Sequence, residues 1–196
     1  GQSGGPTAVI NSSLYGVVSE GLAHPDTIEH VYGMVNGIEG FLNDRVLDFE
    51  EVLPGEKLEY LTHTPGAYLG SCRYKLPESL EDPVYPVLFR KFEELNIGWF
   101  FYIGGNDSMD TVSKLSRYAA SIGSPIRVIG EPKTIDNDLV NTDHTPGFGS
   151  AAKYVAATVR EITTDANVYE KKSVTIIEIM GRHAGWLTAA SALARK

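Results

Sequence analysis

The sequence predicts an α/β fold with a mainly parallel sheet flanked by helices. Short apolar runs alternate with segments whose apolar residues recur at helical spacing, and polar or glycine-rich loops follow the runs. Continuous apolar runs are typical of strands buried on both faces, and this alternation is typical of parallel sheets. The 196 residues, 42% of them hydrophobic, suffice for one core or for one domain and part of another.

The first half of the chain opens with a glycine-rich turn that leads into a helix. Apolar residues fall on one helical face from residue 7 to about residue 23, and Pro6, a residue favoured at helix starts, stands before them. The elements predicted next are a short strand at 31–35 (VYGMV), a loop or single helical turn at 36–44, and a loop with short elements at 43–66.

The second half repeats a strand, a loop and a helix. The predicted helices are 84–96, 108–121, about 148–165 and 183–194, each with apolar residues on one face. The predicted strands are 97–103 (IGWFFYI), 126–130 (IRVIG) and 173–179 (SVTIIEI). A polar loop occupies residues 131–149. The abrupt start, and an end inside a helical pattern, suggest a fragment of a longer chain.

Charge and composition exclude several classes of function. The net charge of −8 argues against nucleic acid or a membrane surface as the main partner. Cys72 is the single cysteine, so neither a disulfide framework nor a cysteine-based metal site is expected. The sequence shows no signal peptide and no apolar run of the ~18 residues that a membrane span needs. A cytoplasmic setting is expected.

Ligands in open α/β sheets bind beyond the carboxyl ends of the strands, which singles out the loops there. Gly4 and Gly5 precede a helix start, where bare backbone N–H groups favour phosphate, although a simple tight turn is the alternative. Gly104 and Gly105 repeat the arrangement after a strand. Asn106 and Asp107, which follow, offer oxygen ligands for Mg²⁺. Asp107 or Ser108 is also expected to cap the next helix.

The loop PKTIDND, residues 132–138, carries the most chemistry. In an extended loop Asp136 and Asp138, two apart, point the same way. One carboxylate can then remove a hydroxyl proton while the other holds metal or orients the base, and Lys133 supplies a charge for phosphate. The alternative is a polar surface turn. Arg73 and Arg182 are further candidates for phosphate binding.

Five motifs in this order, GGPTAVIN, LGSCR, GGNDS, PKTIDND and EIMGRHAGWL, resemble the phosphofructokinase family across nearly the whole chain. The resemblance implies a Rossmann-like fold with an incomplete second domain. It implies a pyrophosphate-binding (phosphoryl-donor) domain at 1–132 and the start of a sugar-phosphate-binding domain at 133–196. The implied reaction is phosphoryl transfer to the 1-hydroxyl of fructose 6-phosphate, with Mg²⁺ as cofactor, in a homodimer or homotetramer.

The family's roles carry over to matching positions. Asp136 matches the general base, Asp138 an accessory acid, and Arg182 a residue close to the transferring group. The implied sugar-phosphate contacts are Thr134, Ile135, Asp136, Met180, Gly181 and Arg182. The implied pyrophosphate contacts and donor-specificity residues are Gly4, Gly5, Arg73, Gly104, Gly105, Asp107, Ser108 and Lys133. The implied metal positions are Asp107 and Asn106, although Asn106 replaces the family's usual aspartate and lacks its charge.

Two positions indicate the phosphoryl donor. Members that use ATP generally have glycine where this chain has Asp107, whereas members that use inorganic pyrophosphate have Asp there and Lys at the position of Lys133. A carboxylate in that position would repel the α-phosphate of ATP. The resemblance therefore favours pyrophosphate. The alternatives are an ATP-dependent enzyme and a catalytically silent sugar-phosphate-binding subunit, although the latter has no need of Asp136, Asp138 and Arg182.

Overall fold

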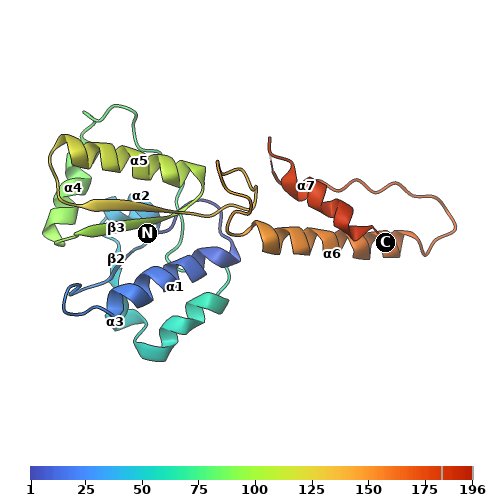
Figure 1. Ribbon diagram of the computed structural model, residues 1–196, viewed down its shortest axis with the longest axis horizontal. Helices are drawn as coiled ribbons and strands as arrows, with labels where there is room; N and C mark the ends of the chain where they lie inside the picture. The colour runs from blue at the N-terminus through green and yellow to red at the C-terminus, as the bar shows by residue number, and fades with distance from the viewer. Residues whose placement is uncertain (182, 196) are drawn as a thin grey trace. The chain divides into compact units, whose positions relative to one another are not determined.

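The computed structural model describes residues 1–181 and 183–195. Its elements are, in order, α1 (Ala8–Leu22), β1 (Tyr32–Met34), α2 (Gly37–Leu42), β2 (Val46–Asp48), α3 (Phe49–Val52), η1 (Gly55–His63), α4 (Val84–Glu94), β3 (Trp99–Gly104), α5 (Asn106–Ser121), β4 (Arg127–Pro132), α6 (Phe148–Ala166), α7 (Trp186–Ala190) and η2 (Ser191–Ala194) (Figure 1). The chain divides into two compact units, Gly1–Lys133 and Thr134–Lys196.

The first unit is built on parallel strands. β3 pairs with β4 in parallel, with Trp99 opposite Arg127. On the other edge of β3, Gln2 forms a parallel bridge to Ile103, whose N–H donates to the Gly1 carbonyl at 2.8 Å. The segment at Gln2, β3 and β4 therefore run in the same direction, and their carboxyl ends lie at the same end of the sheet. The predicted α/β fold with a parallel sheet is confirmed, and β1 and β2 add a separate antiparallel pair.

Side chains of β3 alternate between two hydrophobic clusters, as expected for a strand covered on both faces. Phe100 and Tyr102 belong to one cluster, with Phe41 of α2, Phe92 of α4 and Leu115 of α5. Ile103 belongs to the other cluster, with Ile10, Leu14 and Val18 of α1 and Leu61 of η1. Figure 1 shows α5 and α1 on opposite sides of the strand pair. Because α1 follows the segment at Gln2 and α5 follows β3, both helices begin at the end of the sheet where these strands finish.

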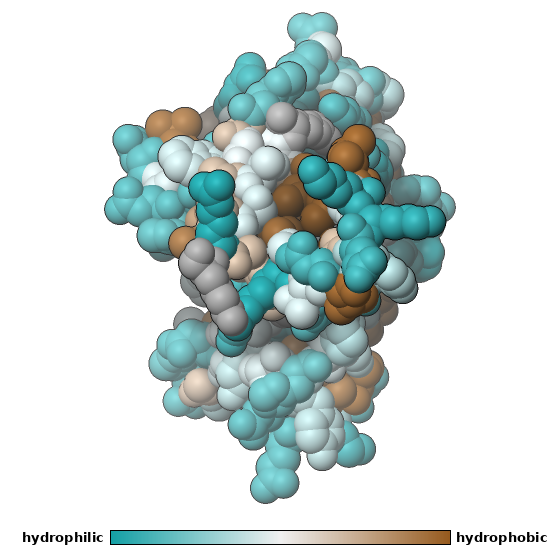
Figure 2. All heavy atoms as spheres, turned by 90° about the vertical axis from the view of Figure 1, so that its right-hand side faces the viewer, coloured by the Kyte–Doolittle hydropathy of each residue, from teal (hydrophilic) through white to brown (hydrophobic). Residues whose placement is uncertain are grey.

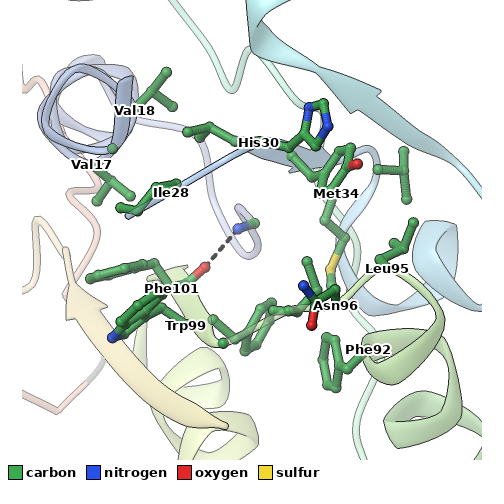
Figure 3. Close-up of a pocket in the computed structure, with 18 of the residues that line it drawn as sticks. Val17, Val18, Ile28, His30, Met34, Phe92, Leu95, Asn96, Trp99 and Phe101 are labelled. Carbon is green, nitrogen blue, oxygen red and sulfur yellow. Dashed lines mark hydrogen bonds between the residues drawn. The ribbon is translucent and has the colours of Figure 1, made fainter. Parts of the chain in front are cut away.

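An apolar cavity of about 410 Å³ lies along β3 in the first unit (Figure 3). Its lining includes Val17 of α1, Met34 of β1 and Trp99 of β3. The backbone nitrogen of Gly1 also lines it and donates a hydrogen bond to the Phe101 carbonyl at 2.7 Å.

The second unit differs from the prediction at residues 173–179. This predicted strand has no regular secondary structure, and Val174 and Ile176 are each 91% exposed. A strand requires a neighbour for its backbone hydrogen bonds, and no strand of the described residues pairs with this segment. The predicted helix at 183–194 is shorter than expected, since it divides into α7 and the 3₁₀ helix η2.

Helix α6 of the second unit contacts α7 and η2. Leu187 of α7 is buried, whereas Tyr154 of α6 and Leu193 of η2 are exposed apolar side chains. The face of the molecule shown in Figure 2 is mostly hydrophilic, with scattered hydrophobic residues. Among the described residues, no helix combines the length and the apolar character that crossing a membrane requires.

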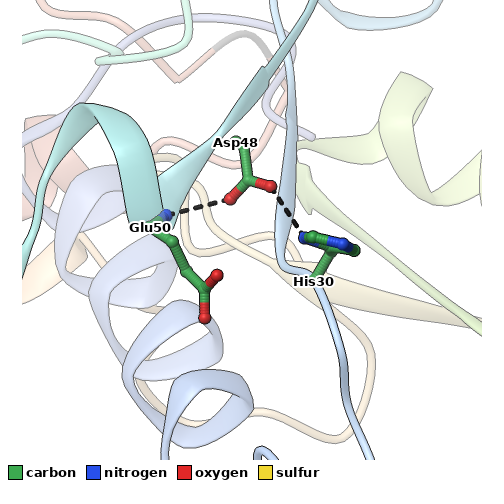
Figure 4. Close-up of side chains that lie close together, drawn as sticks. All are labelled: His30, Asp48 and Glu50. Atoms are coloured by element: carbon green, nitrogen blue, oxygen red, sulfur yellow. Dashed lines mark hydrogen bonds and ion pairs between the residues drawn. The ribbon is translucent and has the colours of Figure 1, made fainter.

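His30, Asp48 and Glu50 form a polar cluster in the first unit, where β2 passes into α3 (Figure 4). Their ligand atoms lie within 4.8 Å of one another. Both oxygens of Asp48 are engaged, because Oδ1 accepts from the N–H of Glu50 at 3.0 Å and Oδ2 lies 3.0 Å from His30 Nδ1. The His30 ring also stacks on Tyr32. A helix cap and a histidine–aspartate pair thus account for this cluster.

Candidate functional site

Three loops of the first unit meet where the parallel strands end. Gly4 has a φ of +81°, a conformation that favours glycine. A β-carbon on Gly4 would lie 3.7 Å from the N atom of Gly105 and 3.9 Å from both Lys133 Nζ and Ser108 Oγ. The turn after the first strand segment is therefore adjacent to the start of α5 and to the residue that follows β4.

Ser3 and Ser108 join two of these loops. Their hydroxyl groups are hydrogen-bonded, and both residues are buried. Between them Gly104 leaves no space for a side chain, because a β-carbon would lie 2.0 Å from Ser108 Oγ and 2.7 Å from the Ser3 carbonyl oxygen. The double glycine of the second loop thus has a packing reason at Gly104 in addition to any role toward a ligand.

The helices α1 and α5 both begin at the end of the sheet where the parallel strands finish. Gly105 is the N-cap of α5 and Thr7 that of α1, and neither helix has a side-chain cap hydrogen bond. The Thr7 hydroxyl is buried and has no hydrogen-bond partner in the described part of the chain. The capping expected from Asp107 or Ser108 is wrong, because Ser108 bonds to Ser3 instead and Asp107 is exposed. Uncapped helix starts with bare glycines can accept an anion.

Lys133 brings a buried cation to the same place. Its side chain donates to the Gly5 carbonyl at 2.6 Å, its backbone N–H donates to the Gly104 carbonyl at 2.9 Å, and the residue is 4% exposed. These contacts place Lys133 in the first unit, although the sequence predicts it at the start of the second domain. A buried ammonium group beside a glycine turn favours a phosphate ligand.

Asp107 lies in the first turn of α5, with its carboxylate exposed to solvent. Lys75 Nζ lies 3.4 Å from its Oδ1. The sequence gives little sign of Lys75, because it falls two residues after the LGSCR motif in a segment without regular secondary structure. Arg73 and Asn106, two other predicted site residues, are exposed.

In the second unit, the loop after β4 encloses one oxygen of Asp136. Oδ1 of this residue is buried and accepts no hydrogen bond from the described residues, while its backbone N–H donates to Thr134 Oγ1 at 3.0 Å. Thr134 is held in turn by a bridge to Gly147, and Ile135 lies beside the same glycine. A buried carboxylate oxygen without a partner is costly, and such groups are found at functional sites.

Asp136 and Asp138 do not share an environment. Asn137 between them has a φ of +56°, so the loop turns there and is not extended as expected. The Asn137 side chain stabilises the turn, accepting from the N–H of Thr145 at 2.8 Å and donating to the Asp143 carbonyl at 3.0 Å. Asp138 is exposed, whereas Asp136 is half-buried. The two carboxylates are therefore not an equivalent pair.

The last predicted contacts lie before α7. Met180 is exposed, and Gly181 is buried with a φ of +143°, a backbone conformation suited to glycine. The carbonyl of Gly181 accepts a hydrogen bond from the N–H of Ala184 at 2.8 Å, which forms the turn before the helix. Arg182 lies outside the described residues.

Comparison with known proteins gives one family. The family model described as Phosphofructokinase matches residues 1–196. A protein of Methylococcus capsulatus named pyrophosphate–fructose 6-phosphate 1-phosphotransferase is 45% identical over 98% of this chain and 46% of its own length. A protein of Rhodospirillum rubrum with the same name is 47% identical over 100% of this chain and 46% of its own length.

A solved structure agrees with these relatives. The pyrophosphate-dependent phosphofructokinase of Marinobacter aquaeolei matches with a TM-score of 0.89 and 46% identity, over 100% of this chain and 48% of that one. The chain thus spans about half the length of the relatives that it matches.

Proposed function

The chain belongs to the phosphofructokinase family, and from this premise we propose that its protein transfers a phosphoryl group from inorganic pyrophosphate to the 1-hydroxyl of fructose 6-phosphate. The products are fructose 1,6-bisphosphate and phosphate. The reaction is reversible, because the two phosphoryl donors have comparable transfer potential, and it serves glycolysis and gluconeogenesis. Relatives that are 45% and 47% identical carry the name of this activity, which supports the proposal.

The observation that carries the choice of donor is the arrangement around Lys133. Its buried ammonium lies against the Gly4–Gly5 turn, and Asp107 opens the adjacent helix α5. Lys133, the turn N–H groups and the two helix starts bind the anionic pyrophosphate, with Arg73 as a further cation. Asp107 occupies the path that the phosphate chain of ATP would take, and thereby excludes the longer donor.

On the acceptor side, Asp136 acts as the general base. Its buried Oδ1, which no described residue hydrogen-bonds, accepts the proton of the sugar 1-hydroxyl as the phosphoryl group arrives in line. The exposed Asp138 is an accessory acidic residue. The residues that hold the sugar phosphate are Thr134, Ile135, Met180, Gly181 and Arg182, and Arg182 also neutralises charge on the transferring group.

The residues at the start of α5 fit a Mg²⁺ ion. Asp107 offers an exposed carboxylate and Asn106 an amide oxygen, and Mg²⁺ is usually held by one or two carboxylates together with substrate phosphate. When bound, the ion supplies positive charge that screens the pyrophosphate oxygens. Asn106, which is neutral, contributes less than the aspartate usual in the family. The setting proposed is the cytoplasm, and the assembly a homodimer or homotetramer.

Phosphoryl-donor profiling of the complete protein tests the proposal. With fructose 6-phosphate and Mg²⁺, turnover is expected with pyrophosphate and not with ATP, and phosphate release should equal fructose 1,6-bisphosphate formed. Turnover with ATP alone would instead identify an ATP-dependent enzyme. Binding of fructose 6-phosphate without turnover on either donor would identify a silent subunit.

A further inference from the structure

The backbone on either side of Lys75 is held in place. Towards the N-terminus, the Ser71 hydroxyl donates to the Gly4 carbonyl at 2.5 Å, and the N–H of Gly4 donates to the Cys72 carbonyl at 3.4 Å. On the other side, Leu76 is buried in the core, and its carbonyl accepts from Lys114 Nζ at 3.0 Å. The segment that carries Lys75 is thus attached to the same glycine turn that Lys133 contacts.

Burial alternates along this segment. Tyr74 is half-buried and Leu76 is buried, whereas Arg73 and Lys75 are exposed. Alternation of this kind places Arg73 and Lys75 on the same, solvent-facing side of the chain. Two cations therefore face outward next to the loops proposed to bind pyrophosphate, and Lys75 is the one that reaches the carboxylate of Asp107, at 3.4 Å.

Asp107 presents a difficulty for any anionic donor. A carboxylate that repels ATP also repels pyrophosphate, which carries several negative charges and binds beside it. Exclusion of ATP requires the volume of the Asp107 side chain, but pyrophosphate binding is favoured when the charge of that side chain is compensated. Among the described residues, Lys75 is the one whose ammonium group lies within ion-pair distance of this carboxylate.

We propose that Lys75 is a donor-specificity residue, which neutralises Asp107 so that pyrophosphate binds beside a side chain that still blocks the longer donor. The inference rests on the proposed function and extends it to a residue outside the family motifs quoted above. Lys75 acts through Asp107 and is a positioning residue. Its loss should therefore affect the KM for pyrophosphate and leave the KM for fructose 6-phosphate unchanged.

A double-mutant cycle in the complete protein tests this inference. Lys75→Met is expected to raise the KM for magnesium pyrophosphate about tenfold, because an uncompensated carboxylate then faces the donor. Adding Asp107→Asn to Lys75→Met should lower that KM again relative to Lys75→Met alone, because the amide keeps the volume of the side chain and an oxygen for Mg²⁺ without the charge. Lys91→Met, which removes the partner of Asp44 in the same unit, is the matched control and should leave both KM values unchanged.

Two results would overturn the role of Lys75. One is an unchanged KM for pyrophosphate in Lys75→Met, and the other is a raised KM that Asp107→Asn does not lower. A wild-type protein without turnover on pyrophosphate would overturn the proposed function as well, so the two failures are distinguished by which protein shows them.

Discussion

Replacement of Asp136 by serine is expected to lower kcat about a thousandfold, while the KM for fructose 6-phosphate changes by no more than about twofold. Serine cannot accept the proton of the sugar hydroxyl, and the carboxylate contributes to the transition state more than to substrate binding. Steady-state kinetics with pyrophosphate at saturating concentration measure both constants.

Asp143→Ser is the matched control for this variant. Asp143 lies in the same loop and is exposed, and the loop uses its backbone carbonyl, which the substitution keeps. Its kcat should stay near that of the wild type. The melting temperature of Asp136→Ser should be no lower than that of the wild type, because the substitution removes a buried oxygen without a hydrogen bond. An unchanged kcat in Asp136→Ser would remove this residue as the base.

The double replacement of Asp107 and Lys133 by glycine is expected to lower kcat/KM for pyrophosphate about a hundredfold, the loss of one strong charged contact. The same protein should acquire turnover with ATP, because the side chain in the path of the longer phosphate chain is gone. Parallel assays with the two donors at equal fructose 6-phosphate concentration measure this change in specificity.

The control for the double variant is Asp44→Gly with Lys91→Gly, which removes another aspartate–lysine pair of the first unit. Thermal unfolding of both variants separates loss of structure from loss of donor binding, since Lys133 is buried and donates to Gly5. If pyrophosphate use stays intact and ATP is still not accepted, this account of donor specificity is wrong.

The parallel strands β3 and β4 and the long helices were predictable because their signals are local. The run at 97–103 is apolar along its length, and this can be recognised without knowing which side chains pack against it. Helices α5 and α6 show the helical period of apolar residues over 16 and 19 residues. The segment 173–179 has an equally strong apolar signal but forms no strand among the described residues. Its state depends on a pairing partner, which a local pattern does not specify.

The candidate site divides in the same way. Residue type and the family motifs make Asp107, Lys133 and Asp136 candidate site residues from the sequence alone. Lys75 carries no motif signal, because its proposed role rests on its 3.4 Å approach to Asp107. The capping of α5 was predicted wrongly for a related reason. Ser108 suits a helix start in sequence, but in the folded chain its hydroxyl bonds to Ser3, which lies 105 positions away.

The amino-acid sequence was sufficient for the α/β class, which follows from periodicity, and for the family, which follows from the resemblance of its motifs to those of phosphofructokinases. The same resemblance supplies the residues proposed to select the donor. The folded chain was needed to learn that Lys133 is buried against Gly5, that one oxygen of Asp136 has no partner among the described residues, and that Lys75 pairs with Asp107. Burial and pairing join residues far apart in the chain, and their free energies depend on the whole packed structure.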